Sequence, residues 1–152
     1  MRRTDKEITK KEEMEAIIAK ATICRIGFID TDAPYIVPMN FGYQNNCLYF
    51  HSAHQGRKID ILKKNNNVCF EIDSNHEVIN TGIPCNWSSK YASVMGTGKA
   101  SILTDDDQKK EGLSIIIDHY SSGSSYSFSK KKLDEVVIMK IEIVQMTGKK
   151  SI

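Results

Sequence analysis

The chain has 152 residues, of which 40% are hydrophobic and 26% are charged, and its formal net charge at neutral pH is +2. This size and composition predict one soluble globular domain over residues 1–152, because a chain of this length lacks the residues for two independent cores. The small net charge and the scattered lysine pairs argue against a nucleic-acid surface, and no apolar run approaches the roughly 20 residues that cross a bilayer. Since residues 1–7 are charged rather than apolar like a signal peptide, we expect a cytoplasmic protein.

The first part of the chain shows a helix pattern followed by strand patterns. Apolar residues at helical spacing predict an amphipathic helix over residues 10–20, with Thr9 and Glu12 as a capping box. Alternating and β-branched residues then predict strands at residues 22–29, 35–43 and 47–52. Residues 54–64 indicate a short helix, which the asparagines at 65–67 end.

Pro38 lies in the middle of the second predicted strand. Proline has no backbone N–H to donate to a sheet ladder, so it is found at sheet edges, at bulges or where pairing is broken. The sequence leaves two interpretations open. Pro38 marks a sheet edge, or it marks backbone that is free to meet a ligand.

The rest of the chain alternates between strands and helices. The patterns predict a strand at 68–73, a loop at 74–88, a long strand at 91–103, a helix capped by residues 104–107 and ending near residue 120, a loop at 121–129, a helical turn at 130–135 and a last strand at 136–143. Six strands with this punctuation predict a mainly β fold, a six-stranded antiparallel barrel with peripheral helices.

The strongest local signal for binding lies at residues 51–58. A strand ends in imidazole and hydroxyl groups, Gly56 follows, and a helix opens with Arg57 and Lys58. Free N–H groups at a helix start favour an anion, and the two cations reinforce this preference, so the pattern predicts a phosphate site. The alternative is a pair of solvated cations on a helix surface. The histidines and cysteines lack the spacing of a metal site, and the Gly-rich nucleotide loops are absent.

Several segments resemble one family when they are taken together. Residues 35–43, 48–53 and 56–58 resemble the pyridoxamine 5′-phosphate oxidase-related, FMN-binding split-barrel flavoproteins. Residues 85–87, 91–98 and 146–150 are similar to the 5-nitroimidazole-resistance (Nim-type) branch of that family. The resemblance covers nearly the whole chain in the right order. It implies a six-stranded split β-barrel that forms a homodimer, with FMN, or alternatively FAD, at each subunit interface.

The resemblance also implies the residues of the site. The flavin ring would be lined by Val37, Pro38, Met39 and Asn40. The ribityl chain and phosphate would be bound by His51, Ser52, Ala53, Gly56, Arg57 and Lys58. The partner subunit would contribute Tyr91, Ser93 and Val94, with Trp87 covering part of the pocket. His51 is the candidate catalytic residue, placed to protonate a reduced substrate.

The activity that the resemblance implies is a flavin-dependent reduction of small molecules such as nitroimidazoles and other nitroaromatic compounds. A nicotinamide nucleotide is the expected electron donor, although no dedicated nicotinamide motif is present. Residues 147–152 lack the arginine-containing ending of true pyridoxamine phosphate oxidases, so that activity is not expected. The alternative is a non-catalytic module that binds flavin or haem, with His51, His54 or His119 as the haem ligand.

Overall fold

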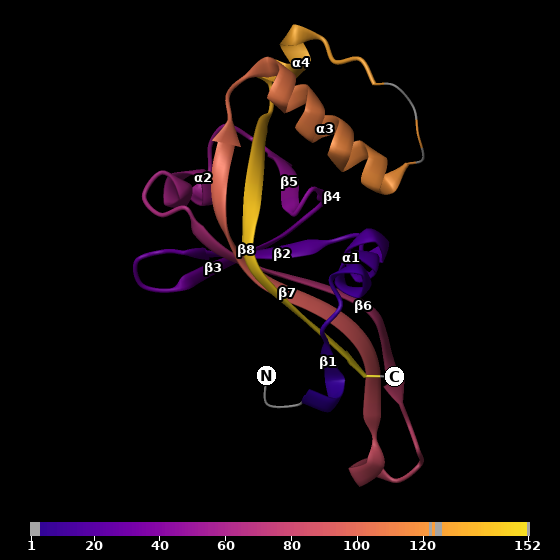
Figure 1. The fold of residues 1–152 in the computed structure, drawn as a ribbon. Helices are drawn as coiled ribbons and strands as arrows, with labels where there is room; N and C mark the ends of the chain where they lie inside the picture. The colour runs from indigo at the N-terminus through magenta and orange to yellow at the C-terminus, as the bar shows by residue number, and fades with distance from the viewer. Residues whose placement is uncertain (1–3, 122, 124–125, 152) are drawn as a thin grey trace.

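The computed structural model describes residues 4–121, 123 and 126–151 of the chain (Figure 1). Its strands are β1 (Glu7–Ile8), β2 (Cys24–Ile29), β3 (Pro34–Met39), β4 (Gly42–Gln44), β5 (Cys47–Ser52), β6 (Asn67–Ile79), β7 (Ser88–Leu103) and β8 (Val137–Ser151). Its helices are η1 (Thr4–Lys6), α1 (Lys11–Lys20), α2 (Arg57–Leu62), η2 (Pro84–Asn86), α3 (Asp106–Tyr120) and α4 (Lys130–Asp134).

The strands form one antiparallel sheet that curls into a barrel. The strand order is β3-β2-β6-β7-β8-β5-β4, and β1 pairs with the end of β8. The two strands at the ends of this order are consecutive in the chain, because only Asn40 and Phe41 separate β3 from β4. The end of β3 and the start of β4 therefore lie close together, although no ladder pairs these two edge strands within the described residues. The predicted mainly β class is confirmed, although the sheet contains eight strands rather than six.

The structure corrects the predicted loop at 74–88. β6 and β7 continue through most of this region as a long two-stranded arm, which extends well beyond the barrel (Figure 1). The register shifts between Ser74 and Glu77, and Asn75 has a φ of 57°. The ribbon is exposed on both faces near its tip. Without a buried face it lacks the apolar alternation by which a strand is recognised.

Other parts of the prediction also differ from the structure. The predicted strand at 35–43 is broken at Asn40, and the last strand continues to Ser151. The capping box is wrong: the residue before α1 is Lys10, and it makes no side-chain capping bond. Of the predicted loop at 121–129, residues 122, 124 and 125 lie outside the described residues.

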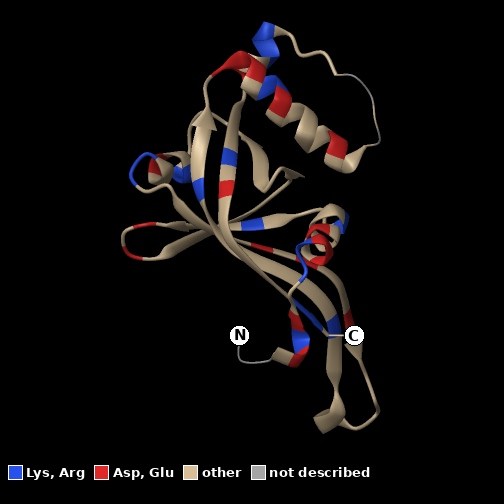
Figure 2. Ribbon diagram, viewed as in Figure 1, with Lys and Arg blue, Asp and Glu red and all other residues tan. Residues whose placement is uncertain are grey.

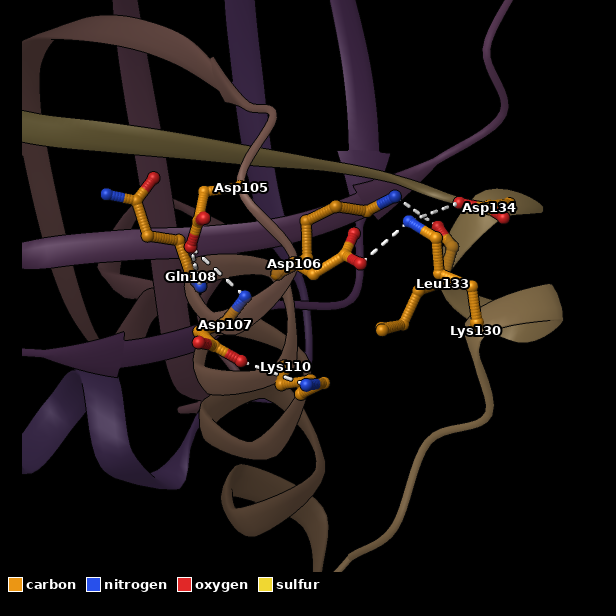
Figure 3. Close-up of polar contacts among 9 residues, drawn as sticks. Asp105, Asp106, Asp107, Gln108, Lys110, Lys130, Leu133 and Asp134 are labelled. Atoms are coloured by element: carbon orange, nitrogen blue, oxygen red, sulfur yellow. Dashed lines mark hydrogen bonds and ion pairs between the residues drawn. The ribbon is translucent and has the colours of Figure 1, made fainter.

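The cap of α3 is confirmed. Asp105 accepts hydrogen bonds from the backbone N–H groups of Asp107 and Gln108, at 3.1 and 3.0 Å (Figure 3). Lys130 of α4 lies 2.7 Å from a carboxylate oxygen of Asp106, so the first turn of α3 also anchors α4 (Figure 3). The predicted helical turn at 130–135 is thereby confirmed and tied to the barrel.

The core fills the barrel and extends under the helices. Phe28, Phe41, Phe50 and Phe70 are its largest fully buried side chains. α1 packs on β6 and β7, while α3 covers β4 and β5. Among the described residues, no helix combines the length and the apolar character that crossing a membrane requires.

Candidate functional site

The residues expected to bind a phosphate lie where β5 ends and α2 begins. Gly56 makes this turn with a φ of 135°, a conformation that favours glycine. Arg57 and Lys58 are the first residues of α2; Arg57 is exposed and Lys58 is half-buried. Since α2 has only six residues, the two charged side chains matter more for anion binding than its helix dipole.

The guanidinium of Arg57 reaches across to the β2–β3 hairpin. Its Nε and Nη2 atoms each lie 2.9 Å from Oδ2 of Asp30. Its carbon atom lies 4.6 Å from the ring centroid of Tyr35, which is a cation–π contact. The Arg57 side chain is still 57% exposed. Figure 2 shows the acidic β2–β3 turn beside the basic residues of the α2 region.

The position of the Asp30 carboxylate is fixed by hydrogen bonds from two residues. The backbone N–H of Thr31 donates to Oδ1 at 2.9 Å, so the two carboxylate oxygens have different donors. The hydrogen bond from Thr31, and then the one from Arg57, lower the pKa of Asp30 below its ordinary value. Asp30 is therefore ionised at neutral pH. The sequence gives no local signal for this role, because Asp30 lies between two predicted strands and 27 residues before Arg57.

Strand β3 carries the residues expected to line a flavin ring. Within the described chain its only sheet partner is β2, with Pro38 opposite Arg25. The sheet-edge interpretation of Pro38 is therefore confirmed. Val37 and Met39 pack against the core, whereas Pro38 and Asn40 are exposed. A ligand lying along this edge would meet these two side chains and an unpaired stretch of backbone.

The break between β3 and β4 is held by α3. The hydroxyl of Tyr120 donates to the carbonyl of Thr22 at 2.8 Å and accepts from the backbone N–H of Phe41 at 3.0 Å. Nδ2 of Asn40 lies 3.5 Å from the same Thr22 oxygen. Tyr120 thus fixes the point where the predicted ring-lining strand leaves the sheet edge. The sequence analysis missed this tyrosine as well.

The end of β5 presents the remaining predicted residues of this group. His51 is exposed and pairs across the sheet with Ile138 of β8. Ser52 is buried, and its hydroxyl donates to the carbonyl of Ala53 at 3.1 Å. The imidazole of His51 is open to a substrate, while the Ser52 hydroxyl would have to rotate to reach a ligand.

The other histidines considered as haem ligands bind backbone carbonyls. Nε2 of His54 lies 2.7 Å from the Asp134 oxygen, and Nε2 of His119 lies 2.6 Å from the Ala21 oxygen. Each histidine therefore has only its Nδ1 atom left for a metal in this arrangement. In the part of the chain that the structure describes, no group of three or more His, Cys, Asp or Glu side chains could hold a metal ion.

The residues expected from a partner subunit lie along the arm and at its junction with the barrel. Trp87 is 50% exposed, and Tyr91 has the amines of Lys6 and Lys149 within 5.9 and 5.6 Å of its ring centroid. Ser93 is half-buried, but Val94 is fully buried in the core, so only its backbone could meet a ligand. Within one chain the arm and α2 lie on opposite parts of the molecule (Figure 1).

A cavity of about 560 Å³ opens on the outer face of the sheet. It is shared by β2, β3, β6, β7 and β8, and its side chains include Ile36, Cys69 and Met95. Ile36 and Met95 are 63% and 56% exposed. Exposed apolar side chains that gather on one face mark an interaction surface. The sequence analysis missed this cavity, because its residues come from five strands.

Charges line the cavity on one side. Nη1 of Arg25 lies 3.1 Å from Glu71 and also contacts Asp73. Desolvation, followed by the charge of Asp73, raises the pKa of Glu71, although Arg25 opposes this shift. The cavity therefore combines an apolar floor with a compact charged cluster.

Comparisons with known proteins agree with this architecture. A family profile described as pyridoxamine 5′-phosphate oxidase matches residues 10–150. The crystal structure of a candidate 5-nitroimidazole antibiotic resistance protein from Bacteroides thetaiotaomicron VPI-5482 is 38% identical, with a TM-score of 0.85 over 94% of this chain and 85% of that one. The FAD and heme binding protein from Mycobacterium smegmatis has a TM-score of 0.86 over 96% and 73% of the chains, but only 17% identity, so it supports the fold alone.

A curated relative gives a shorter match. An uncharacterized protein of Rhizobium meliloti (strain 1021) is 32% identical over 65 residues, which are 43% of this chain and 42% of that protein. The family profile instead covers every segment on which the resemblance was based, and that resemblance is confirmed. The chain belongs to the pyridoxamine 5′-phosphate oxidase family.

Proposed function

We propose that this protein is a flavin-binding oxidoreductase that reduces small molecules, with nitroimidazoles and other nitroaromatic compounds as the first substrates to test. The observation that carries the proposal is Arg57, which is held beside the edge strand β3 with part of its guanidinium exposed. Arginine binds phosphate with a planar fork of N–H groups, and Lys58 adds a second positive charge. FMN is the proposed cofactor, and FAD would use the same site for its first phosphate.

The bound flavin would supply the electron transfer, and the protein would supply position and protons. The exposed edge of β3, from Val37 to Asn40, would lie along the flavin ring. Tyr120 would hold this edge in place through Phe41. His51, exposed at the end of β5, would protonate the reduced substrate. A nicotinamide nucleotide is the proposed electron donor.

We propose that two copies of the chain form the complete site. The outer-face cavity exposes Ile36 and Met95, which a second copy would cover. The partner would bring its own Tyr91 and Trp87, because within one chain the arm formed by β6 and β7 extends away from α2 (Figure 1). All four cysteines are free thiols, and we propose a cytoplasmic location for the protein.

The proposal is tested by removing the phosphate-binding charges. The double variant Arg57→Ala with Lys58→Ala should lower FMN affinity by about 100-fold or more, because each charge-assisted hydrogen bond contributes roughly 1.5–3 kcal/mol. The matched control is Lys63→Ala with Lys64→Ala, which removes two exposed charges just after the same helix. Flavin fluorescence titration gives the affinities, and circular dichroism checks the fold. A double variant that keeps the full flavin complement would contradict the placement of the phosphate.

The reductase activity needs a separate assay. The reduced holoprotein, mixed anaerobically with a nitroimidazole, should regain its oxidised flavin absorption as the nitro group is consumed. His51→Gln should slow this reoxidation, and the rate is compared at saturating FMN because His51 is also expected to contact the ribityl chain. If the wild-type flavin is not reoxidised by nitroaromatic compounds, the proposed substrate class is wrong.

A further inference from the structure

The guanidinium of Arg57 is restrained on one edge and one face by two residues of the β2–β3 hairpin. Oδ2 of Asp30 accepts a hydrogen bond from Nε at 2.9 Å and forms an ion pair with Nη2 at 2.9 Å, and the ring of Tyr35 lies 4.6 Å from the guanidinium carbon. Asp30 lies 27 residues before Arg57, so the contact depends on the fold rather than on local sequence. An exposed arginine without such partners samples many rotamers.

The restraint leaves a defined part of the guanidinium open. An arginine has five N–H groups in a fixed plane. Oδ2 of Asp30 accepts from the Nε–H and also lies 2.9 Å from Nη2, so one N–H of Nη1 and one N–H of Nη2 remain on the end of the guanidinium away from Asp30. These are the groups of the Nη1–Nη2 edge, which can bind two oxygens of one phosphate.

Asp30 and Tyr35, which hold Arg57, are themselves fixed in position. The two oxygens of Asp30 are divided between Arg57 and the backbone N–H of Thr31. Tyr35 is held in turn by strand pairing opposite Phe28, whose ring centroid lies 6.1 Å away. The hairpin therefore sets the position of the carboxylate and of the ring before any ligand binds.

We propose that Asp30 and Tyr35 are positioning residues that present the Nη1–Nη2 edge of Arg57 to the phosphate of the flavin. This inference rests on the proposed function. Asp30 brings a negative charge near the phosphate, which opposes binding. The fixed orientation of Arg57 outweighs this repulsion, because the Asp30 carboxylate is partly open to water and its charge is screened there. The arrangement favours FMN over riboflavin, which has no phosphate.

The test compares FMN and riboflavin affinities in matched variants. Asp30→Asn and Tyr35→Leu should each weaken FMN binding by about three- to tenfold, in line with the modest worth of exposed ion pairs and restrained side chains. Riboflavin affinity should change by less than about twofold, because riboflavin makes no contact with Arg57. Asp32→Asn is the control, since it removes the same charge from the same turn. Tyr35→Phe keeps the ring and should behave like the wild type.

A double-mutant cycle isolates the coupling to Arg57. In an Arg57→Lys background, Asp30→Asn should no longer weaken FMN binding, because lysine has no second edge to present. If Asp30→Asn instead tightens FMN binding in the wild-type background, repulsion is the dominant effect and the proposal is overturned. Equal losses in both backgrounds would overturn it too.

A measurement without flavin separates this inference from the proposed function. In the ¹⁵N NMR spectrum of the unliganded protein, the Arg57 Nε–H signal should be protected from exchange, and Asp30→Asn should abolish that protection. If the wild type shows the protection but binds neither FMN nor riboflavin, the contact between Asp30 and Arg57 exists and the proposed function fails. If flavin binds but the signal is unprotected, the positioning role of Asp30 is wrong and the proposed flavin-binding function is unaffected.

Discussion

Tyr120 makes two hydrogen bonds with its single hydroxyl, to Thr22 and to Phe41, and both partners belong to the backbone around the β3–β4 break. Tyr120→Phe keeps the ring but leaves a carbonyl and an N–H without this partner. We expect a loss of about 1 kcal/mol in the free energy of unfolding, since the site is partly exposed and water can replace part of the contact. Urea titration measures the change.

The control for this prediction is Tyr126→Phe. The Tyr126 hydroxyl contacts the hydroxyl of Ser121, which is exposed, so its removal should change stability by less than about 0.5 kcal/mol. Equal effects of the two substitutions would show that Tyr120 does not hold the β3–β4 break.

The cysteines should differ sharply in reactivity. Burial raises the pKa of the Cys24 thiol well above its ordinary value, whereas Cys85 is exposed beside the arm tip. Because the thiolate is the reactive form, a maleimide at mildly alkaline pH should label Cys85 within minutes and Cys24 only after unfolding. Mass spectrometry of digested samples gives the extent at each position. Native labelling of Cys24 at the rate of Cys85 would contradict the packing of β2.

For individual residues, the sequence identified the charged side chains of the proposed phosphate site but not the residues that contact and position them. Arg57 and Lys58 could be recognised because they follow Gly56 at a strand–helix junction. Asp30 and Tyr120 could not, since their contacts join residues that lie 27 and 98 positions apart. Such contacts follow from the curvature of the whole sheet, for which one sequence carries no local signal.

Gly42 allows helix α3 to pack directly on strand β4. A Cβ atom at this position would lie 2.5 Å from the carbonyl oxygen of Ile115, a backbone atom that cannot rotate away. Gly42→Ala should therefore lower the free energy of unfolding by about 1–3 kcal/mol. Because α3 also carries Tyr120, the variant should weaken flavin binding. Urea titration and FMN titration measure the two effects.

The comparison is Gly27→Ala, where the nearest atom to a new Cβ is the sulfur of the Cys69 side chain, at 2.6 Å. This thiol can move toward the open cavity, so the loss of stability should be smaller. A larger loss for Gly27→Ala than for Gly42→Ala would mean that α3 is not packed on β4 as described.

Among the elements, strands with a buried face were predicted well and exposed strands were not. β5 is a short apolar run with Leu48, Tyr49 and Phe50 buried in succession, since α3 packs on it, and the asparagines at 45 and 46 adopt the positive φ values of its hairpin turn. Residues 74–88 of the arm were predicted as a loop. Both faces of the ribbon are exposed there, so the sequence shows no alternation of apolar and polar residues. Among the helices that cover the barrel, α1 followed from its apolar spacing alone, and α3 followed from its cap and its apolar spacing.

The whole molecule is expected to act as a dimer through the outer-face cavity. Met95→Lys places a charge where Met95 is now 56% exposed on that face. We expect this variant to sediment as a monomer and to lose flavin, because the partner's residues would be missing from the site. Ser101→Lys is the control, since it adds the same charge to the same strand outside the cavity. A Met95→Lys dimer with full flavin would exclude this face as the interface.

The most direct measurement of the central claim is the absorption spectrum of the purified protein, followed by identification of the cofactor released on denaturation. The account predicts flavin bands in the visible region and the release of FMN, which Arg57 and Lys58 hold by its phosphate. A protein without bound flavin should regain these bands when FMN is supplied. A haem Soret band, or no uptake of supplied flavin, would contradict the account and favour a haem-binding or other non-catalytic role.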